Sequence, residues 1–471
     1  MIPVCTPDEM AAVDAAAPEP LDVLIDRAGA AVARAVLDEL GGGYGRRVAV
    51  LVGKGSNGAD GRVAAERLGR RGVRTSIVDA ASAPERLPIG GGHAVDLVVD
   101  AAYGTGLGRP FEAPSVDVPV LAVDLPSGLD GLTGEAMGRP LAARRTVTFA
   151  ALKPGLLFGG GPVLAGRVEV VDLGLDMSAA TAHLLEDTDI AALVPSRPTD
   201  AHKWQSACWV VAGSPGMEGA AGLAATAALR AGAGYVRLSV PDGLVGSEEP
   251  VVADEVVHLP IGLELFLEEE EQARFASMVV GPGLGTADEV ADGVRRLVAS
   301  SGPPLVVDGD GLTALAGYRA DGSSRPLVLT PHDGEYFRLT GRPPSPDRMA
   351  AARSLAADTG AVVLLKGPTT VVAAPDGRVL LAAAGDARLA TAGSGDVLAG
   401  IIGALLARGA GPLEAAAAAA HVHGRLATAS GLNELTPTGV VAGDLSARLV
   451  SVLADLSIDA TDLADQTKGA Y

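Results

Sequence analysis

Aromatic residues are scarce in this sequence of 471 residues, at 3%, although 48% of all residues are hydrophobic. The interior must therefore be filled mainly by alanine, valine and leucine, which favours closely packed helices on valine-rich strands. With 20% charged residues, the composition is typical of a globular chain and excludes extensive disorder. A chain of this length exceeds the usual size of one hydrophobic core, so we expect two or three domains.

Cysteine is almost absent, with Cys5 and Cys208 the two examples. Two cysteines so far apart exclude a disulfide framework or a cysteine-rich metal cluster, and they favour a reducing compartment. No uncharged apolar run is long enough to span a membrane, and the opening stretch MIPVCTPDEM has neither a basic segment nor an apolar core. We therefore expect a cytoplasmic protein that has no membrane partner.

Basic residues are outnumbered, since 37 Lys and Arg against 57 Asp and Glu give a formal net charge of −20. Such a charge repels polyanions, and no basic run offsets it, so we expect no nucleic-acid partner. A small anionic ligand would have to be held by glycine-rich loops, helix N-termini or bound cations.

Short valine-rich runs alternate with alanine-rich helical stretches along nearly the whole chain, a pattern typical of parallel α/β folds. The strands expected in the first part cover 47–52, 74–78, 95–100, 119–124, 145–150 and 167–172, and those in the second part cover 206–214, 235–240, 277–281, 304–308, 326–330, 361–365 and 370–374. The acidic, proline-containing segment from residue 186 has no strand pattern and marks a domain entry. We predict a first domain over 1–185, a second over 186–460 and a flexible tail over 461–471.

The stretch TAGSGDVLAG (391–400) predicts a glycine-rich loop that runs directly into a helix. Free backbone N–H groups at Gly393, Ser394 and Gly395 would form an anion hole at the positive end of this helix. Asp396 in the first turn is placed to accept a hydroxyl proton, a combination that indicates phosphoryl transfer to an alcohol. The alternative is that Asp396 is an ordinary first-turn acid stabilised by the helix dipole.

Polar residues follow several strands of the first part within glycine-rich loops. The segments concerned are GKGSNGADG (53–61), LVVDAAYGTGLGRP (97–110) and AVDLPSGLDGLTG (122–134). Because the carboxyl ends of parallel strands share one sheet edge, Asn57, Asp100 and Ser127 would present oxygen ligands suited to an alkali or alkaline-earth cation. Asp124 is then a candidate acid or base. Ordinary turn and loop-capping roles are the alternative for each residue.

The motifs GKGSNGADG, VVDAAYGTGLGRP, VDLPSGLD and TVTFAALKPGL, in this order, resemble those of the NAD(P)H-hydrate epimerase domain over roughly residues 1 to 180. The resemblance implies that Asn57, Asp100 and Ser127 bind potassium and that Asp124 contacts the reacting end of the damaged cofactor. The other cofactor contacts that it implies are Ser56, Asn57, Gly58, Ala59, Asp60, Gly104, Thr105, Gly106, Leu107, Gly108, Arg109 and Pro110. The family usually reads NNGGDG where this chain has SNGADG, a departure that concerns affinity more than activity.

Six ordered motifs of the second part resemble the ADP-dependent NAD(P)H-hydrate dehydratase, a branch of the ribokinase-like fold. They lie at 202–236, 279–285, 306–315, 330–341, 364–372 and 392–409. The resemblance implies that ADP contacts Lys366, Gly367, Pro368, Thr369, Thr370 and Gly395, and that the hydrate contacts Ala220, Gly283, His332 and Asp396. Taken alone, LKGPTTVV also fits a plain β-hairpin and His332 a loop histidine, while His421 and His423 on an alanine-rich helix fit core positions better than a metal site.

The resemblance implies an α/β protein with an N-terminal Rossmann-like doubly wound sheet and a C-terminal ribokinase-like α/β domain. We expect a repair enzyme that epimerises the R and S forms of NADHX and NADPHX and dehydrates the S form with ADP, K⁺ and Mg²⁺, giving NADH or NADPH, AMP and phosphate. Asp396 would deprotonate the hydroxyl that receives the phosphoryl group, and Asp124 would move a proton during epimerisation. The expected partners are NADHX, NADPHX and ADP, and the expected assembly is a homo-oligomer.

Two alternatives stay open. One is a ribokinase-like kinase of a small vitamin-type alcohol, which a stably phosphorylated product from ATP would favour. The other makes the first domain a non-catalytic Rossmann-like binding domain, and the two can be combined in one chain. The presence of Asn57, Asp100, Asp124 and Ser127 weighs against a non-catalytic first domain. The choice of ADP over ATP depends on the resemblance alone.

Overall fold

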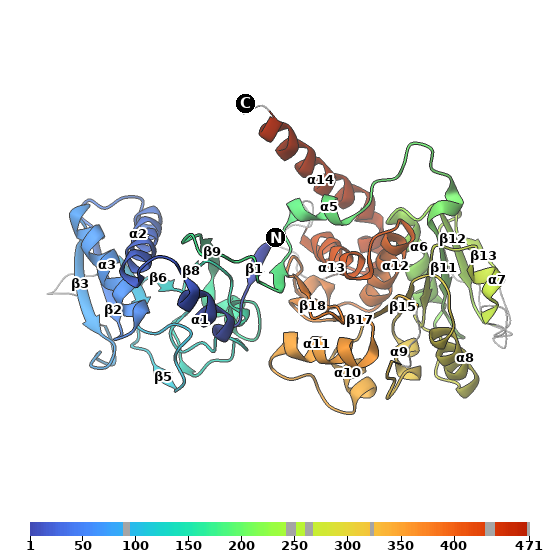
Figure 1. Ribbon diagram of the computed structural model, residues 1–471, viewed down its shortest axis with the longest axis horizontal. Coiled ribbons are helices and arrows are strands. Elements are labelled where there is room, and N and C mark those ends of the chain that lie inside the picture. The colour runs from blue at the N-terminus through green and yellow to red at the C-terminus, as the bar shows by residue number, and fades with distance from the viewer. Residues whose placement is uncertain (88–94, 242–250, 260–266, 321–324, 429–438, 469–471) are drawn as a thin grey trace. The chain divides into compact units, whose positions relative to one another are not determined.

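The computed structural model describes residues 1–87, 95–241, 251–259, 267–320, 325–428 and 439–468, with side chains of the last helix described as far as Leu456 (Figure 1). The chain divides into two compact units, Ile2–Ala182 and His183–Tyr471, the second of which also includes Met1. The division falls close to the predicted boundary between residues 185 and 186, which stays a prediction. Both units are α/β structures, as the sequence indicates.

The first unit is built on a six-stranded sheet in which every neighbouring pair of strands is parallel. The order across the sheet is β3 (Arg74–Asp79), β2 (Arg47–Val52), β4 (Leu97–Ala101), β6 (Val120–Val123), β8 (Arg145–Phe149) and β9 (Arg167–Val171). All six predicted strands are present. β4 and β6 are buried along their whole length, which explains why both are apolar except for Asp100 in β4. The strand order reverses between β2 and β4, where open α/β sheets bind ligands.

The two faces of this sheet are covered differently. Helices α1 (Pro7–Ala16), α2 (Leu21–Leu40) and α3 (Ser56–Arg70) contribute to one hydrophobic cluster with side chains such as Val50 and Val99. On the opposite face, Leu51 and Val98 join a cluster with β5 (Phe111–Glu112) and with the irregular segments that flank β7 (Gly138–Arg139). The unit also contains β1 (Ile2–Val4) and α4 (Gly161–Ala165). The Rossmann-like sheet is confirmed, with helical cover concentrated on one face among the described residues.

The second unit contains a longer sheet that combines parallel and antiparallel pairs. Within this unit the strands follow one another across the sheet in the order β10 (Ala182–Leu184), β19 (Val379–Ala382), β18 (Thr370–Ala373), β17 (Val362–Leu365), β16 (Leu327–Leu329), β15 (Leu305–Val307), β14 (Ser277–Val280), β11 (Ala207–Val211), β12 (Tyr235–Ser239) and β13 (Val257–His258). Across the sheet from β13 to β17, every neighbouring pair of strands is parallel, including those of β11 and β12. By contrast, β17, β18 and β19 form an antiparallel meander. The seven strands predicted for this part are confirmed, while β10, β13 and β19 were not expected.

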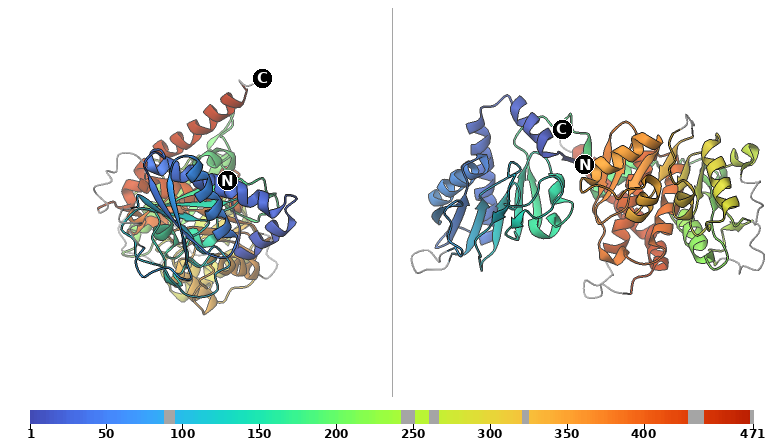
Figure 2. Two further views of the ribbon diagram at one scale, coloured as in Figure 1. Left: turned by 90° about the vertical axis from the view of Figure 1, so that its left-hand side faces the viewer. Right: turned by 90° about the horizontal axis from the view of Figure 1, so that it is seen from below.

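Helices lie on both faces of this sheet (Figure 1, Figure 2). One layer consists of α6 (Glu218–Arg230), α12 (Ser394–Ala407), α13 (Pro412–Thr428) and α14 (Ala442–Lys468), and the other of α8 (Asp288–Ala299), α9 (Asp310–Ala314), α10 (Asp333–Thr340) and α11 (Arg348–Thr359). The short helices α5 (Ile190–Leu193) and α7 (Glu269–Gln272) complete the unit. The first layer is packed with alanine and glycine: a Cβ atom on Gly400 would lie 2.2 Å from the Ala224 carbonyl oxygen. Small residues therefore let α12 approach α6 closely enough to compensate for the shortage of aromatics.

Helix α14 extends as far as Lys468, so helical backbone occupies much of the range 461–471 where the sequence predicts a flexible tail. Residues 469–471 lie outside the described part of the chain. Among the helices that the structure describes, none combines the length and the apolar character needed to cross a membrane.

Candidate active sites

A cavity of about 380 Å³ lies in the first unit at the reversal of strand order. Several of the predicted cofactor contacts line it, namely Ser56, Asn57, Asp60, Gly104, Thr105, Gly106, Leu107 and Asp124. Gly58, Ala59, Gly108, Arg109 and Pro110 are not among its lining residues. Gly58 has a backbone role instead, because a Cβ atom there would lie 2.1 Å from the Gly53 carbonyl oxygen. The sequence reasoning missed Asp14 and Lys153, which also line the cavity.

Asp124 is held in an unusual conformation at the end of β6. Its φ of +65° is uncommon for a residue other than glycine, although aspartate adopts the left-handed region more readily than most. The Asp124 carboxylate lies 2.6 Å from Lys153 Nζ and accepts a hydrogen bond of 3.1 Å from Thr148 Oγ1. A carboxyl group held in place at the wall of a cavity can exchange protons with a bound ligand.

Two more acids share this cavity with Asp124. Burial raises the pKa of Asp60 to about 8, and the nearby Asp124 and Asp14 add to the shift. The pKa of Asp14 is also raised, chiefly by burial, although Lys153 acts in the opposite direction. The cavity therefore combines carboxyl groups with different tendencies to ionise, an arrangement that suits acid–base chemistry.

The three predicted potassium ligands lie beside the cavity. Asp100 is fully buried, and it accepts hydrogen bonds of 2.8 Å from the Ser127 backbone N–H and 2.6 Å from Ser127 Oγ. Burial raises the pKa of Asp100, while these hydrogen bonds oppose the shift. Both polar atoms of the Asn57 side chain are buried, and neither has a hydrogen-bond partner among the residues that the structure describes. An unpartnered amide oxygen together with a buried carboxylate and a hydroxyl fits a hard cation.

In the second unit, the loop at 391–396 leads into α12 as the sequence predicts. Gly393 has a φ of +85° and is the N-cap, and of the backbone N–H groups that follow, that of Ser394 donates a hydrogen bond of 3.3 Å to the Thr391 carbonyl oxygen. A Cβ atom on Gly395 would lie 3.4 Å from Lys366 Nζ and 3.9 Å from Asp308 Oδ2. The absence of a side chain at Gly395 thus lets the helix N-terminus approach a lysine and an acid from distant parts of the chain.

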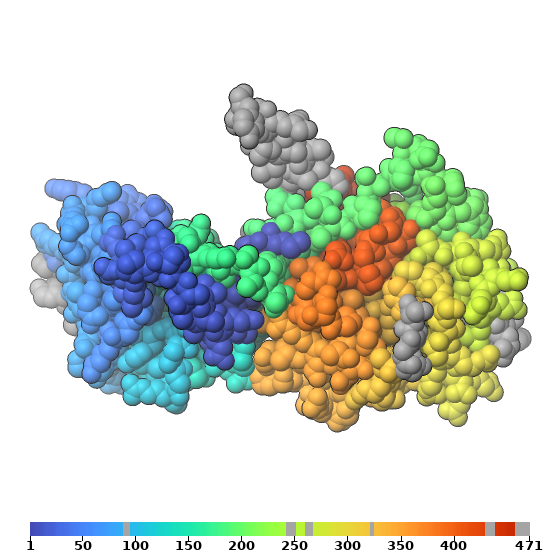
Figure 3. Space-filling view, in the orientation of Figure 1, coloured from blue at the N-terminus to red at the C-terminus, as the bar shows by residue number. Residues whose placement is uncertain are grey.

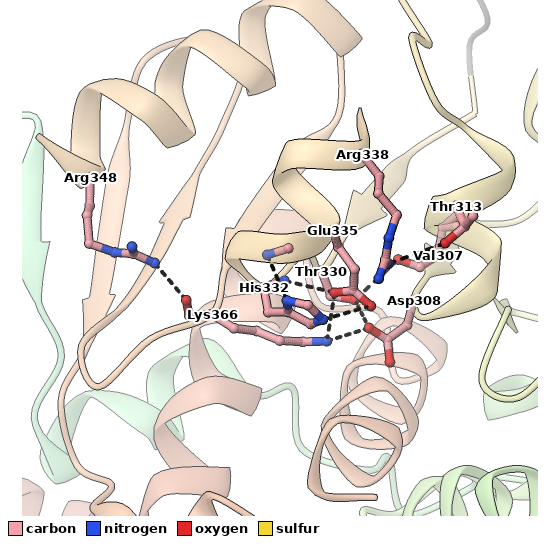
Figure 4. Close-up of polar contacts among 10 residues, drawn as sticks. Val307, Asp308, Thr313, Thr330, His332, Glu335, Arg338, Arg348 and Lys366 are labelled. Atoms are coloured by element: carbon pink, nitrogen blue, oxygen red, sulfur yellow. Dashed lines mark hydrogen bonds and ion pairs between the residues drawn. The ribbon is translucent and has the colours of Figure 1, made fainter. Parts of the chain in front are cut away.

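Lys366 is the centre of a polar cluster (Figure 4). Its Nζ lies 2.5 Å from Asp308 Oδ1 and 3.8 Å from Glu335 Oε2, and Thr330 Oγ1 donates a hydrogen bond of 2.6 Å to Asp308. Burial alone would lower the pKa of Lys366, but Asp308 and Glu335 raise it, so the ammonium stays charged. The sequence reasoning did not single out Asp308 or Glu335, although both lie in motifs that it quoted.

The other residues predicted to contact the hydrate or ADP occupy loops at the ends of strands. His332 is the N-cap of α10, where its Nδ1 accepts a hydrogen bond of 2.9 Å from the Gly334 N–H. Ala220 and Gly283 are adjacent, since a Cβ atom on Gly283 would lie 3.0 Å from that of Ala220. The turn between the antiparallel strands β17 and β18, together with the first residue of β18, comprises Lys366, Gly367, Pro368, Thr369 and Thr370. The predicted hairpin is therefore present, and it can also carry a ligand.

His421 and His423 are buried in α13, as expected of core positions. His421 Nε2 lies 2.8 Å from Asp187 Oδ1, and burial lowers the pKa of His423 to about 4. Among the residues that the structure describes, no group of three or more His, Cys, Asp and Glu side chains is arranged to hold a metal ion.

Asp396 is a half-buried acid of the second unit whose pKa is strongly raised. Burial raises its pKa to about 7, with a further contribution from the neighbouring Asp308 and a smaller opposing one from Lys366. A general base must be deprotonated, so we expect kcat/KM for the reaction of this unit to fall about tenfold per pH unit below pH 7. Initial rates between pH 5 and pH 9, corrected for the reaction without enzyme, measure this; a profile that is flat down to pH 5 would contradict the role of Asp396.

The fold and the site of the second unit define a class of protein. A parallel sheet extended by an antiparallel meander, with a glycine-led helix N-terminus beside a lysine, is a ribokinase-like arrangement. The same fold occurs in a ribokinase-like superfamily protein from Enterococcus faecalis V583, with 22% identity, a TM-score of 0.52 and coverage of 60% of this chain and 99% of that chain. The family model for NAD(P)H-hydrate dehydratase matches residues 208–450, and the model for the YjeF-related protein N-terminus matches 21–87 and 73–155.

The chain belongs to the family of bifunctional NAD(P)H-hydrate repair enzymes. It is 38% identical to the bifunctional NAD(P)H-hydrate repair enzyme Nnr of Salinibacter ruber, a similarity that covers 96% of each chain. It is also similar to the ADP/ATP-dependent NAD(P)H-hydrate dehydratase of Bacillus subtilis that was co-crystallised with ATP and Mg²⁺, at 29% identity, with a TM-score of 0.52 and coverage of 57% of this chain and 97% of that chain. The resemblance inferred from the motifs is thereby confirmed.

Proposed function

We propose that the chain repairs hydrated nicotinamide cofactors, with one reaction in each unit. The first unit interconverts the R and S hydrates of NADH and NADPH, and the second dehydrates the S hydrate with ADP, giving the intact cofactor, AMP and phosphate. The observation that carries the proposal is that each unit presents a separate site in which an aspartate, Asp124 or Asp396, lies near a lysine, Lys153 or Lys366.

In the second unit, Asp396 takes the proton from the hydroxyl group of the hydrate as that oxygen attacks the terminal phosphoryl group of the nucleotide. The backbone N–H groups at Gly393 to Gly395 stabilise the charge on that group, assisted by Lys366. Phosphate is then a good leaving group, the lone pair of the ring nitrogen drives its departure, and loss of a proton from the neighbouring ring carbon restores the ring double bond and the neutral nitrogen. The phosphoryl transfer is therefore a means of dehydration.

The described side chains form no metal site by themselves, so a divalent cation near Asp396 would be held by carboxylates together with the phosphates of the nucleotide. Asp308, Asp310 and Glu335 surround Asp396 with a surplus of negative charge over the one ammonium of Lys366. Their carboxylate oxygens are ligands of the kind that Mg²⁺ takes, and the ion would neutralise charge on the transferring phosphoryl group. The nucleotide would contact Gly395 and the turn from Lys366 to Thr370.

In the first unit, Asn57, Asp100 and Ser127 would hold K⁺, because the amide oxygen of Asn57 lacks a partner and Asp100 is a buried carboxylate. The ion would help this acidic protein to bind an anionic cofactor. Asp124 would move a proton while the hydroxyl-bearing carbon passes through an iminium-like state that water can attack from either face.

A cytoplasmic location is part of the proposal, since Cys5 and Cys208 are free and buried, as suits a reducing compartment. The expected partners are the hydrates and ADP. A homo-oligomer stays a prediction.

The test mixes the full chain with an equilibrated mixture of R and S hydrates, Mg²⁺ and K⁺, adds ADP or ATP, and follows the recovery of NADH absorbance. Complete recovery with ADP, faster than the hydrates equilibrate without enzyme, is the expected result. Recovery that stops at the S fraction would remove the epimerase from the proposal. If a stable phosphorylated product forms from ATP and no NADH appears, the chain is a small-molecule kinase and not a repair enzyme.

A further inference from the structure

Lys153 is buried in the first unit and uses every donor of its ammonium group. Its side chain is 3% exposed, and its Nζ lies 2.6 Å from Asp124 Oδ1. The same nitrogen donates hydrogen bonds of 3.0 Å to Thr148 Oγ1 and 3.0 Å to the Phe149 carbonyl oxygen. An ammonium with three donors and three acceptors has its position fixed. Strand β8 supplies both Thr148 and Phe149, so the sheet itself positions the lysine.

The cavity holds three carboxyl groups and, among its described lining residues, one basic side chain, that of Lys153. Asp14 comes from α1, Asp60 from α3 and Asp124 from the end of β6. The ion pairs of the described residues join Lys153 to Asp124, and none involves the carboxyl of Asp60. Since like charges at one site disfavour each other, a single ammonium determines which carboxyl is ionised.

The carboxyl groups of Asp14 and Asp60, which form no ion pair with Lys153 among the described residues, differ in their exposure to solvent. Helix α1 lies at the molecular surface (Figure 3), and Asp14 is exposed, so water can stabilise its charge. Asp60 is 7% exposed and has no hydrogen bond to its carboxyl in the described part of the chain. Among the three acids, Asp60 is therefore the one that the surroundings keep neutral.

We propose that Lys153 is a positioning residue for epimerisation, which makes Asp124 the proton acceptor and leaves the Asp60 carboxyl as the proton donor. The inference rests on the proposed function of the first unit. The C–O bond of the hydrate breaks as the lone pair of the ring nitrogen forms a C=N bond, and the departing oxygen takes the proton of Asp60 and leaves as water. A water molecule then adds to the other face of that carbon, the C=N electron pair returns to nitrogen, and the water gives one proton to Asp124. Proton exchange through solvent from Asp124 to Asp60 restores both acids.

The electrostatics of the surrounding groups agree with these roles. Burial raises the pKa of Asp60 to about 8, and Asp124 and Asp14 reinforce the shift, so Asp60 keeps its proton at neutral pH. The other titratable groups near Lys153 are Asp14 and the thiol of Cys5, whose pKa is raised by burial and by Glu9. Lys153 lowers the pKa of both Asp14 and Cys5, so it favours the charged form of each of these groups. Its direct ion-pair partner is Asp124.

The test compares Lys153→Met with Lys153→Arg in the full chain, in buffer with constant K⁺. Epimerisation of the R hydrate is followed from pH 6 to pH 9, and dehydration of the S hydrate by the second unit is the internal control. Without the ammonium, Asp124 faces two carboxyls with no cation and takes up a proton more readily. We expect Lys153→Met to lower kcat for epimerisation about 100-fold at pH 7 with little change in KM, and to recover at least tenfold by pH 9. Lys153→Arg should retain more activity at pH 7 than Lys153→Met does.

Asp60→Asn and Asp14→Asn form a matched pair, because both remove a carboxyl from the same cavity. A loss of epimerisation at least tenfold larger in Asp60→Asn than in Asp14→Asn is the expected result, and equal effects of the two would overturn the assignment of the donor. A loss in Lys153→Met that is uniform from pH 6 to pH 9, or accompanied by a raised KM, would reduce Lys153 to a structural residue. If the unchanged chain does not epimerise, the proposed function itself fails, which is a separate outcome.

Discussion

Replacing Asp396 by Asn is expected to abolish dehydration of the S hydrate while the R and S hydrates still interconvert at the normal rate. The amide has nearly the shape of the carboxylate but cannot accept the hydroxyl proton, and the loss of a positioned general base typically lowers a rate about 100- to 10,000-fold. Asp396 lies among Asp308, Asp310 and Glu335, so the variant also removes one of several mutually repelling acids and should fold normally. The measurement is NADH recovery with ADP, together with chromatographic separation of the two hydrates.

The control is Asp376→Asn, which makes the same chemical change in the exposed turn between β18 and β19 of the same unit. It should leave both reactions unchanged. Equal loss of dehydration and epimerisation in Asp396→Asn would contradict the division of the two reactions between the units. Dehydration that persists within tenfold of the normal rate would show that another group accepts the proton.

The strands could be predicted because buried parallel strands are read as continuous apolar runs that end in glycine-rich loops. Strand β19 escaped prediction because its four residues follow a turn after β18 and carry no glycine-rich loop of their own. The strands β10 and β13 have three and two residues, too few for any periodicity. Strands this short therefore cannot be recognised from their own residues, because their pairing depends on the neighbouring strands and not on their composition.

The glycine-rich loops that border the candidate sites could be located from the sequence, but the pairs of side chains within the sites could not. The loop at 391–396 was placed correctly at a helix N-terminus because its glycines and the apolar run that follows are local signals. The contact between Asp308 and Lys366 joins residues 58 positions apart, and the contact between Asp124 and Lys153 depends on how the turn after β8 folds back toward the end of β6. Each lysine followed a predicted strand, which is the signal that would have marked it for attention.

The site of the first unit yields the second large expected effect: Asp124→Asn should lower epimerisation at least about 100-fold and leave dehydration of the S hydrate intact. NADH recovery from an equilibrated mixture should then stop at the S fraction and continue only at the rate at which the hydrates interconvert without enzyme. The amide cannot take a proton from the added water, and it leaves the ammonium of Lys153 buried without its ion-pair partner. Removing one partner of a buried pair costs about 3–5 kcal/mol, so the first unit should also unfold at a lower temperature.

Because of this cost, a loss of epimerisation in Asp124→Asn must be separated from unfolding of the first unit. The double variant Asp124→Asn, Lys153→Met removes both charges at once, so it should recover most of the lost thermal stability but none of the epimerisation. Asp130→Asn is the matched single control, since Asp130 lies in the same segment and is not among the lining residues of the cavity. If the double variant regains epimerisation, Asp124 is not the proton acceptor. If it regains stability alone, the charge pair serves the chemistry at the expense of the fold, because two uncharged side chains fill the same space without a charge to bury.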